Sequence, residues 1–193
     1  MKYPKFFDAI ETIKIKDDLA EVLGACEDGV IEYSYLDVVK SAGHSCPTIA
    51  GAYLMIKEGL KEFDNPKRGQ INAYLKDAQD DGVTGVTSNV IAQITGATCQ
   101  SGFHGIAGKF DRRNLMHFNA DIDSSLRLID ASGKIVDLHY NPNKIPPHST
   151  LQGLMQKVMS QQASQNAIEE FKKLWQERVE QILKSPSQVL TIK

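Results

Sequence analysis

Gly43-His44-Ser45-Cys46-Pro47 is the stretch whose residue types and spacing best suit chemistry. Imidazole and thiolate are ligands that zinc accepts, and a tight turn can direct a His-x-Cys pair toward one ion. Pro47 favours a helix that starts directly after Cys46, where the helix dipole would stabilise a thiolate. The spacing alone leaves an alternative open, in which His44 caps the turn and Cys46 is simply buried.

A second segment, residues 96–108, is rich in glycine and carries Cys99 and His104. Backbone in such a loop can approach a ligand closely. The chain has only three Cys and five His, so two segments that each offer both residue types favour a metal site. We predict ligation by His44, Cys46 and Cys99, with His104 or water as the fourth ligand. Three protein ligands would leave a reactive open position, whereas four would make a structural site.

The remaining candidates have simpler expected roles. We expect Cys26 to be a small buried residue rather than a ligand. Three histidines lack a Cys or acidic partner at ligand spacing, and we expect them in the core or in solvent: His117, His139 and His148. A basic cluster follows the glycine-rich loop and could bind an anionic group, but a solvated strand face is the simpler interpretation: Lys109, Arg112 and Arg113.

The elements that must position these residues are mixed helices and strands. Apolar periodicity predicts helices over 35–41, from Cys46-Pro47 to Leu60, and over 88–95, 151–159 and 167–183. Ser88 is the expected N-cap of the third, and Gly96 its stop. Alternation predicts strands within 12–15, 20–23, 30–33, 70–75, 114–118, 125–129, 135–140 and 189–192, with a hairpin turn at 130–134.

Because this order has no regular βαβ rhythm, we predict an α+β fold. We expect a core over residues 1–148 and a helical C-terminal extension over 149–193, packed on the core or on a partner. An ordinary terminal helix that covers the sheet is an equally good interpretation of the extension.

Composition excludes several classes of protein. The net charge of −2, from 22 basic and 24 acidic residues, lacks the basic footprint of a nucleic-acid binder. No apolar run approaches the ~18 residues that a membrane helix needs. The N-terminal residues have no apolar segment typical of a cleaved signal peptide. An odd number of cysteines favours a reducing compartment, so we expect a cytoplasmic protein.

Residues 41–47, followed by Ala50-Gly51-Ala52, resemble the formylmethanofuran dehydrogenase E-subunit family, in which a Gly-His-x-Cys-Pro turn opens a helix of small residues. Residues 94–98 and 113–115 stand where that family has a helix ending in Thr-Gly-Cys-Thr and an Asn-Leu strand. The resemblance covers about residues 10 to 140. It implies an α+β core, intertwined homodimers, and zinc or another divalent transition metal near the turn, with only His44 and Cys46 carried over as ligands.

The chain also departs from the family's pattern. Ala42 replaces a histidine often found before the turn, and Ala97 replaces a cysteine, with Cys99 two residues later. The cysteine-rich zinc finger of some members is replaced by the helices beyond Ser149. The resemblance implies an accessory or sensor protein for a molybdenum, tungsten or one-carbon redox metalloenzyme.

Two alternatives stay open. The first is a metal- or thiol-dependent enzyme, with Cys46 or an open metal position at the reactive centre and His104 or tyrosines moving protons. The second is an interaction module whose C-terminal helix binds a partner.

Overall fold

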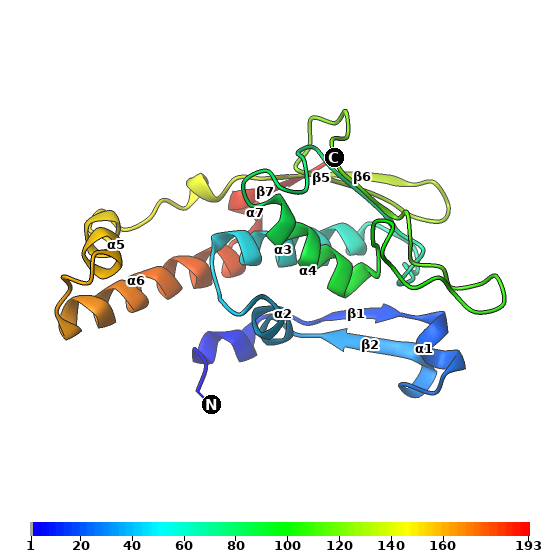
Figure 1. Ribbon diagram of the computed structural model, residues 1–193, viewed down its shortest axis with the longest axis horizontal. Coiled ribbons are helices and arrows are strands. Elements are labelled where there is room, and N and C mark those ends of the chain that lie inside the picture. Colours follow the sequence, from blue (N-terminus) through cyan, green and yellow to red (C-terminus); the bar gives the residue numbers. More distant parts are fainter. Residues whose placement is uncertain (1) are drawn as a thin grey trace.

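The computed structural model describes residues 2–193 and has three layers (Figure 1). A five-stranded sheet lies over the helices α3 and α4, and a two-stranded hairpin with α2 lies beneath them. The helices are α1 (Asp18–Val22), α2 (Tyr35–Ala42), α3 (Pro47–Lys61), α4 (Thr84–Thr95), α5 (Leu151–Met159), α6 (Gln165–Lys184) and α7 (Pro186–Val189). The strands are β1 (Ile13–Lys16), β2 (Val30–Tyr33), β3 (Asn72–Leu75), β4 (Met116–His117), β5 (Leu126–Ile129), β6 (Ile135–Tyr140) and β7 (Leu190–Ile192). The expected α+β class is confirmed.

The larger sheet has the strand order β4-β3-β5-β6-β7. Only the β3–β4 pair is parallel, and β5 and β6 form the predicted hairpin, in which Leu126 lies opposite Leu138. Their alternate side chains are buried against the helices, as expected for an antiparallel sheet with one covered face. β7 pairs with β6 at one edge, as predicted for residues 189–192.

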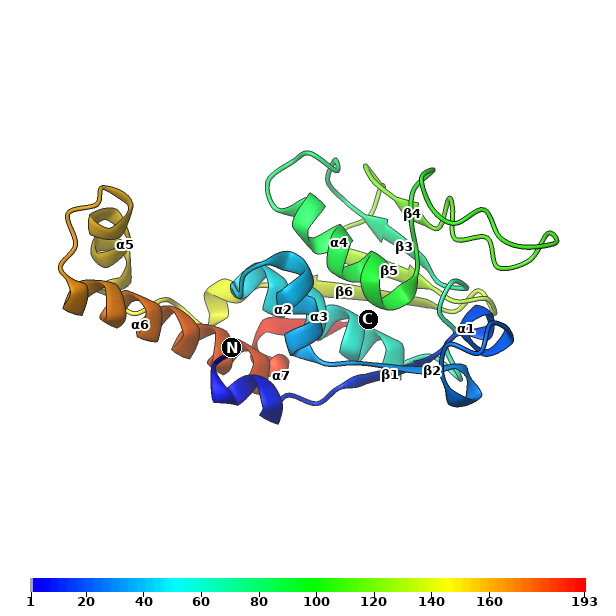
Figure 2. The ribbon, with the colours of Figure 1, turned by 60° about the horizontal axis from the view of Figure 1, so that its bottom comes forward.

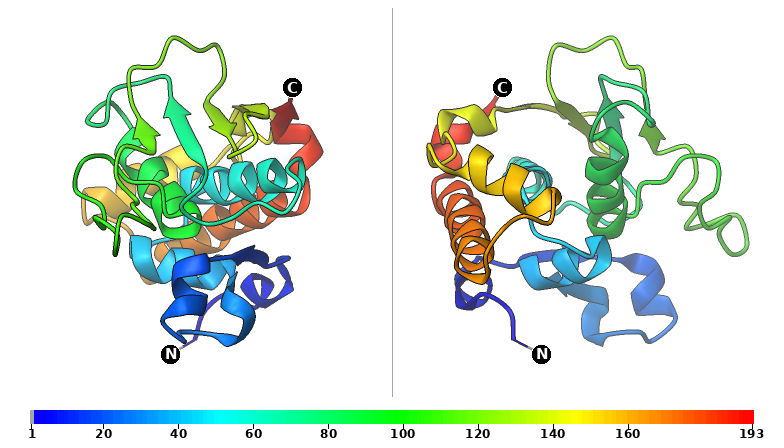
Figure 3. Two further views of the ribbon diagram at one scale, coloured as in Figure 1. Left: turned by 90° about the vertical axis from the view of Figure 1, so that its right-hand side faces the viewer. Right: turned by 60° about the vertical axis from the view of Figure 1, so that its left-hand side comes forward.

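Helix α3 lies in the middle layer and is buried along most of its length (Figure 3). Such a position requires small or apolar residues on nearly every side. Gly59 fits against the sheet, where an added Cβ would lie 2.9 Å from Leu128. Lys57, only 8% exposed, has its ammonium 3.0 Å from Glu11 and 2.9 Å from Glu58, so this buried charge is paired.

The N-terminal layer is joined to the rest by a buried ion-pair cluster. Asp17, 2% exposed, accepts from Arg112 at 2.6 Å and from Arg68 at 3.0 Å. The same carboxylate caps α1 by accepting from the amides of Leu19 and Ala20. Burial alone raises the pKa of Asp17, but the hydrogen bond from Arg68 and the charge of Arg112 outweigh it, so this pKa lies below its ordinary value.

Three local predictions are wrong. Residues 20–23 belong mostly to α1 rather than to a strand, because a four-residue apolar run fits either element and the Asp17 cap selects the helix. Helix α4 begins at Thr84, and Ser88 is not its N-cap, because the Ser88 hydroxyl donates to the Gly85 carbonyl within the helix. Arg112 is 5% exposed and paired with Asp17, so it does not belong to a solvated face.

The C-terminal helices project from the body and then return to it (Figure 2). Helix α5 packs on the outer half of α6, whereas Val179, Ile182 and Leu183 bury the inner half in the core. The chain then re-enters the sheet as β7. The division of the chain at residue 149 stays a prediction. Within residues 2–193, no helix has the length and apolar character needed to cross a membrane.

We predict that Asp17→Asn lowers the free energy of unfolding by about 3–5 kcal/mol at pH 7, because it leaves a buried arginine without its charge partner. The pKa of Asp17 is lower in the folded protein, so its stabilising contribution is present above the unfolded value of about 4 and is lost as the pH falls through the folded value. Urea unfolding should therefore show the variant and the parent converging below about pH 4. Asp111→Asn removes an exposed pair with Arg113 and is the control, for which we expect little change.

Candidate functional site

The His44–Pro47 turn connects α2 to α3. Gly43 caps the C-terminal end of α2, and its φ of +76° is a left-handed conformation that glycine adopts without strain. Cys46 is the extended N-cap residue of α3, and Pro47 is the first residue of the helix, as the sequence predicted. The thiol of Cys46 is half-buried at the start of a helix, and His44 is exposed two residues before it.

Ser45, between the two candidate ligands, is held by side chains from two other helices. Trp175 and Gln176 of α6 both donate to the Ser45 carbonyl, at 2.9 and 3.2 Å. The Ser45 hydroxyl lies 3.0 Å from the Tyr35 hydroxyl at the start of α2. These contacts fix the backbone between His44 and Cys46, although Ser45 itself offers no strong metal ligand.

Tyr140 at the end of β6 holds the other side of the turn. Its hydroxyl donates to the Pro47 carbonyl at 2.7 Å, and its ring lies against Gly51. A Cβ at Gly51 would lie 2.2 Å from the Cε1 atom of Tyr140, which explains a glycine in the middle of a buried helix. Burial raises the pKa of Tyr140 and of Tyr35 well above the ordinary value of a tyrosine. Both hydroxyls therefore stay protonated at neutral pH, and Tyr140 serves as a donor.

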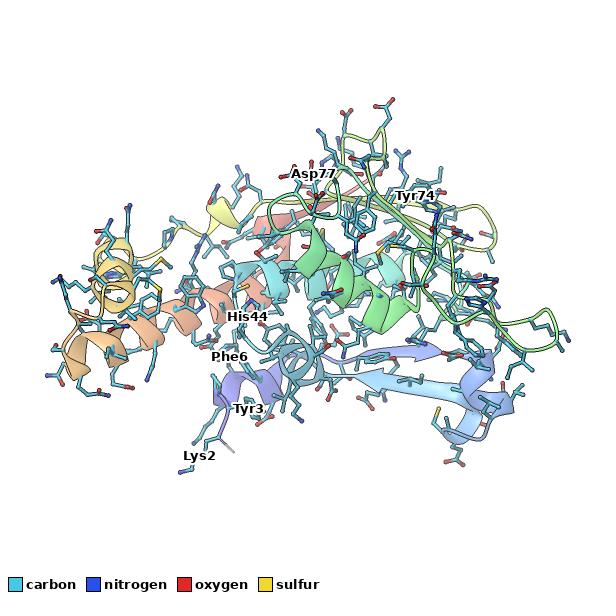
Figure 4. The ribbon with its side chains drawn as sticks, viewed as in Figure 1. Lys2, Tyr3, Phe6, His44, Tyr74 and Asp77 are labelled. Carbon is cyan, nitrogen blue, oxygen red and sulfur yellow. The ribbon has the colours of Figure 1, made fainter. Side chains whose placement is uncertain are left out.

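His44 has its Nδ1 atom 3.0 Å from the Ala42 carbonyl. A carbonyl only accepts, so Nδ1 is the donor in this contact, and in the neutral imidazole the free lone pair is then on Nε2. Metal-bound histidines are held in this way by a hydrogen bond to the nitrogen that does not bind the metal. Figure 4 shows His44 at the base of the α6 arm, near the N-terminal segment that carries Tyr3 and Phe6.

Cys99 and His104 lie in a different part of the molecule. The loop that carries them leaves the C-terminal end of α4 and extends from the side opposite the α5–α6 arm (Figures 1 and 2). His104 is exposed, and half-buried Cys99 lines a separate cavity of about 520 Å³ with Gln79, Asn114 and His117. In the described part of one chain, no three or more His, Cys, Asp or Glu side chains group as a metal site. The four-ligand site stays a prediction, and a single copy of the chain does not assemble it.

The other sequence candidates lie apart from the turn. Cys26 is half-buried at the start of a short 3-10 helix (Glu27–Gly29). His148 contacts the Thr150 hydroxyl, and His139 lines a shallow cavity with Asp137. His117 stacks on Tyr74, with ring centroids 4.4 Å apart.

Sequence reasoning missed the side chains that hold the turn: Tyr35, Tyr140, Trp175 and Gln176. Trp175 is the only tryptophan of the chain and lies among the apolar residues whose periodicity predicts the helix over 167–183. The signal that could have singled it out is its indole N–H, a donor that needs an acceptor when buried.

The family model described as "FmdE, Molybdenum formylmethanofuran dehydrogenase operon" matches residues 42–192. Because the match covers more than half of the chain, the chain belongs to this family, and the predicted resemblance is confirmed. The match starts directly before the His44–Pro47 turn and includes the C-terminal helices, which the resemblance had left out. The β1–β2 hairpin lies outside it. A comparison with curated proteins gave no match.

We predict that Tyr140→Phe lowers the free energy of unfolding by about 1 kcal/mol, since it leaves the Pro47 carbonyl without its side-chain donor. Chemical denaturation would measure the change. Tyr74→Phe is the matched control, because no hydrogen bond of the Tyr74 hydroxyl occurs within residues 2–193, and we expect it to unfold like the parent. An equal loss in the two variants would contradict a specific role for Tyr140.

Proposed function

From its membership of this family, we propose that the chain is a metal-binding accessory or sensor protein for a molybdenum- or tungsten-dependent, or other one-carbon redox, metalloenzyme. In this proposal, His44 and Cys46 bind zinc or another divalent transition metal. The observation that carries it is the fixed backbone of the turn, together with the Nδ1 contact to Ala42 that leaves His44 Nε2 available. When bound, the ion would supply a Lewis-acidic or structural centre. Three free thiols fit a reducing compartment, and we place the protein in the cytoplasm.

Two ligands do not complete a zinc site, so we propose that a homodimer supplies the others. An apolar groove of about 600 Å³ runs beside His44, between the N-terminal segment and the α5–α6 arm. Phe7, Phe171 and Met159 line it, and Met159 is 69% exposed. A second copy on this groove would bury apolar surface and bring its own residues to the exposed side of His44. The donors from the second copy would be its Cys99 and His104, which the sequence predicts as the other ligands.

The metal proposal is tested on protein purified without chelators. We expect about one zinc per chain by elemental analysis, and loss of most of it in His44→Ala and in Cys46→Ser. Zinc added to the metal-free protein should change the fluorescence of Trp175, whose indole is hydrogen-bonded to the turn. Cys26→Ser and His148→Ala are matched controls that should keep the metal. Zinc retained in both turn variants, or absent from the parent, would contradict the proposal.

The homodimer is tested by analytical ultracentrifugation, where we expect twice the mass of one chain. Met159→Glu should weaken association at least tenfold, because it puts a charge into an apolar interface. Val22→Glu alters a residue that is similarly exposed, at 67%, on the N-terminal layer and should leave association unchanged. If Cys99→Ser and His104→Ala dimerise normally but lose zinc, the donors come from this loop. If the parent protein is a monomer and still binds zinc, the homodimer proposal is contradicted, and the turn alone remains as the proposed metal site.

A further inference from the structure

A cavity of about 450 Å³ lies where the first turns of α3 and α4 meet the ends of β3 and β6. Its size is that of a small-molecule site. Buried Met55 and Leu75, with Val83 and Pro142, provide an apolar wall, and the rest of the lining is polar. None of the residues discussed as metal ligands lines this cavity.

Two exposed aspartates line this cavity. Asp77 follows β3, and Asp123 precedes β5. Neither forms an ion pair within 4 Å in the described part of the chain, although the charge of Asp123 contributes to the raised pKa of Arg127. Together they offer four acceptor oxygens, which suit an ammonium group.

Hydrogen-bond donors line the same cavity at the start of α4. Three residues at the start of α4 line the cavity: Val83, Thr84 and Thr87. Thr84 is 8% exposed, and its hydroxyl has no hydrogen-bond partner in the described residues. Lys76 also lines the cavity, forms no ion pair within 4 Å in the described part of the chain, and adds a positive charge. The positive end of a 12-residue helix attracts a carboxylate.

We propose that this cavity binds a zwitterionic α-amino acid with an apolar side chain. The ammonium group binds Asp77 and Asp123, the carboxylate binds the start of α4, and the side chain packs on Met55 and Leu75. A ligand with only a positive charge would be repelled by Lys76 and by the positive end of the helix. A ligand with only a negative charge would be repelled by the two carboxylates. Only a ligand with both charges satisfies both sets of groups. The proposal does not depend on metal binding or on the homodimer.

Isothermal titration calorimetry of the purified full chain tests the ligand class with L-leucine, L-methionine and L-phenylalanine. Two fragments of leucine serve as matched probes: 3-methylbutylamine lacks the carboxylate, and 4-methylpentanoate lacks the ammonium group. We expect at least one amino acid to bind, and each fragment to bind at least tenfold more weakly than leucine. Absence of binding by all three amino acids overturns the proposal, as does a fragment that binds as tightly as leucine.

Variants then locate the site. Asp77→Asn and Asp123→Asn should each weaken the amino acid that binds best at least fivefold, and Thr84→Val should weaken it less. Asp80→Asn removes a charge from the same loop at a residue that does not line the cavity, and binding should change less than twofold. Circular dichroism confirms that each variant is folded. Equal effects of Asp80→Asn and Asp77→Asn would show only a general charge effect and would overturn the assignment.

Discussion

Helix α3 is enclosed by the sheet above it and the N-terminal layer below it, and this enclosure constrains most of the structure. A buried helix meets little water along its length, so its residues must be small, apolar or paired. Gly51 and Gly59 let the sheet approach, and Lys57 is neutralised by two glutamates. The start of the helix meets α2, α6 and β6 through hydrogen bonds to Ser45 and Pro47, and the His44–Pro47 turn occupies it.

The ion-pair cluster around Asp17 has a different role. Replacement of such a buried cluster by well-packed apolar residues is often neutral for stability, so the cluster is better explained by the layers that it joins than by its net energy. The Asp17 carboxylate lies between β1 and α1 and caps α1. It also pairs with Arg68 and Arg112, which come from two distant segments of the chain. Gly69 makes room for this arrangement, because a Cβ there would lie 1.4 Å from Nη1 of Arg112.

Sequence reasoning succeeded where the signal was local. Pro47 and Gly96 mark a helix start and a helix stop through their own backbone preferences, and His44 and Cys46 are neighbours whatever the fold. It failed where the signal depended on partners far along the chain. The burial of Arg112 depends on its partner Asp17, which lies 95 residues away in the sequence. The position of the loop that carries Cys99 depends on the direction in which α4 runs against α3 (Figure 1). Tyr140 and Trp175 look like ordinary core aromatics until the acceptors of their polar atoms are known.

The contact between Trp175 and Ser45 spans 130 residues of sequence. Contacts of such separation form late, because a long loop must close before they can contribute. During synthesis, which proceeds from the N-terminus at roughly 5–20 residues per second, the turn leaves the ribosome several seconds before the helix that holds it. In that interval the thiol and imidazole are present on an unrestrained backbone. The backbone of the turn therefore becomes rigid only when α6 docks. The geometry that the turn needs to bind a ligand thus depends on a completed fold.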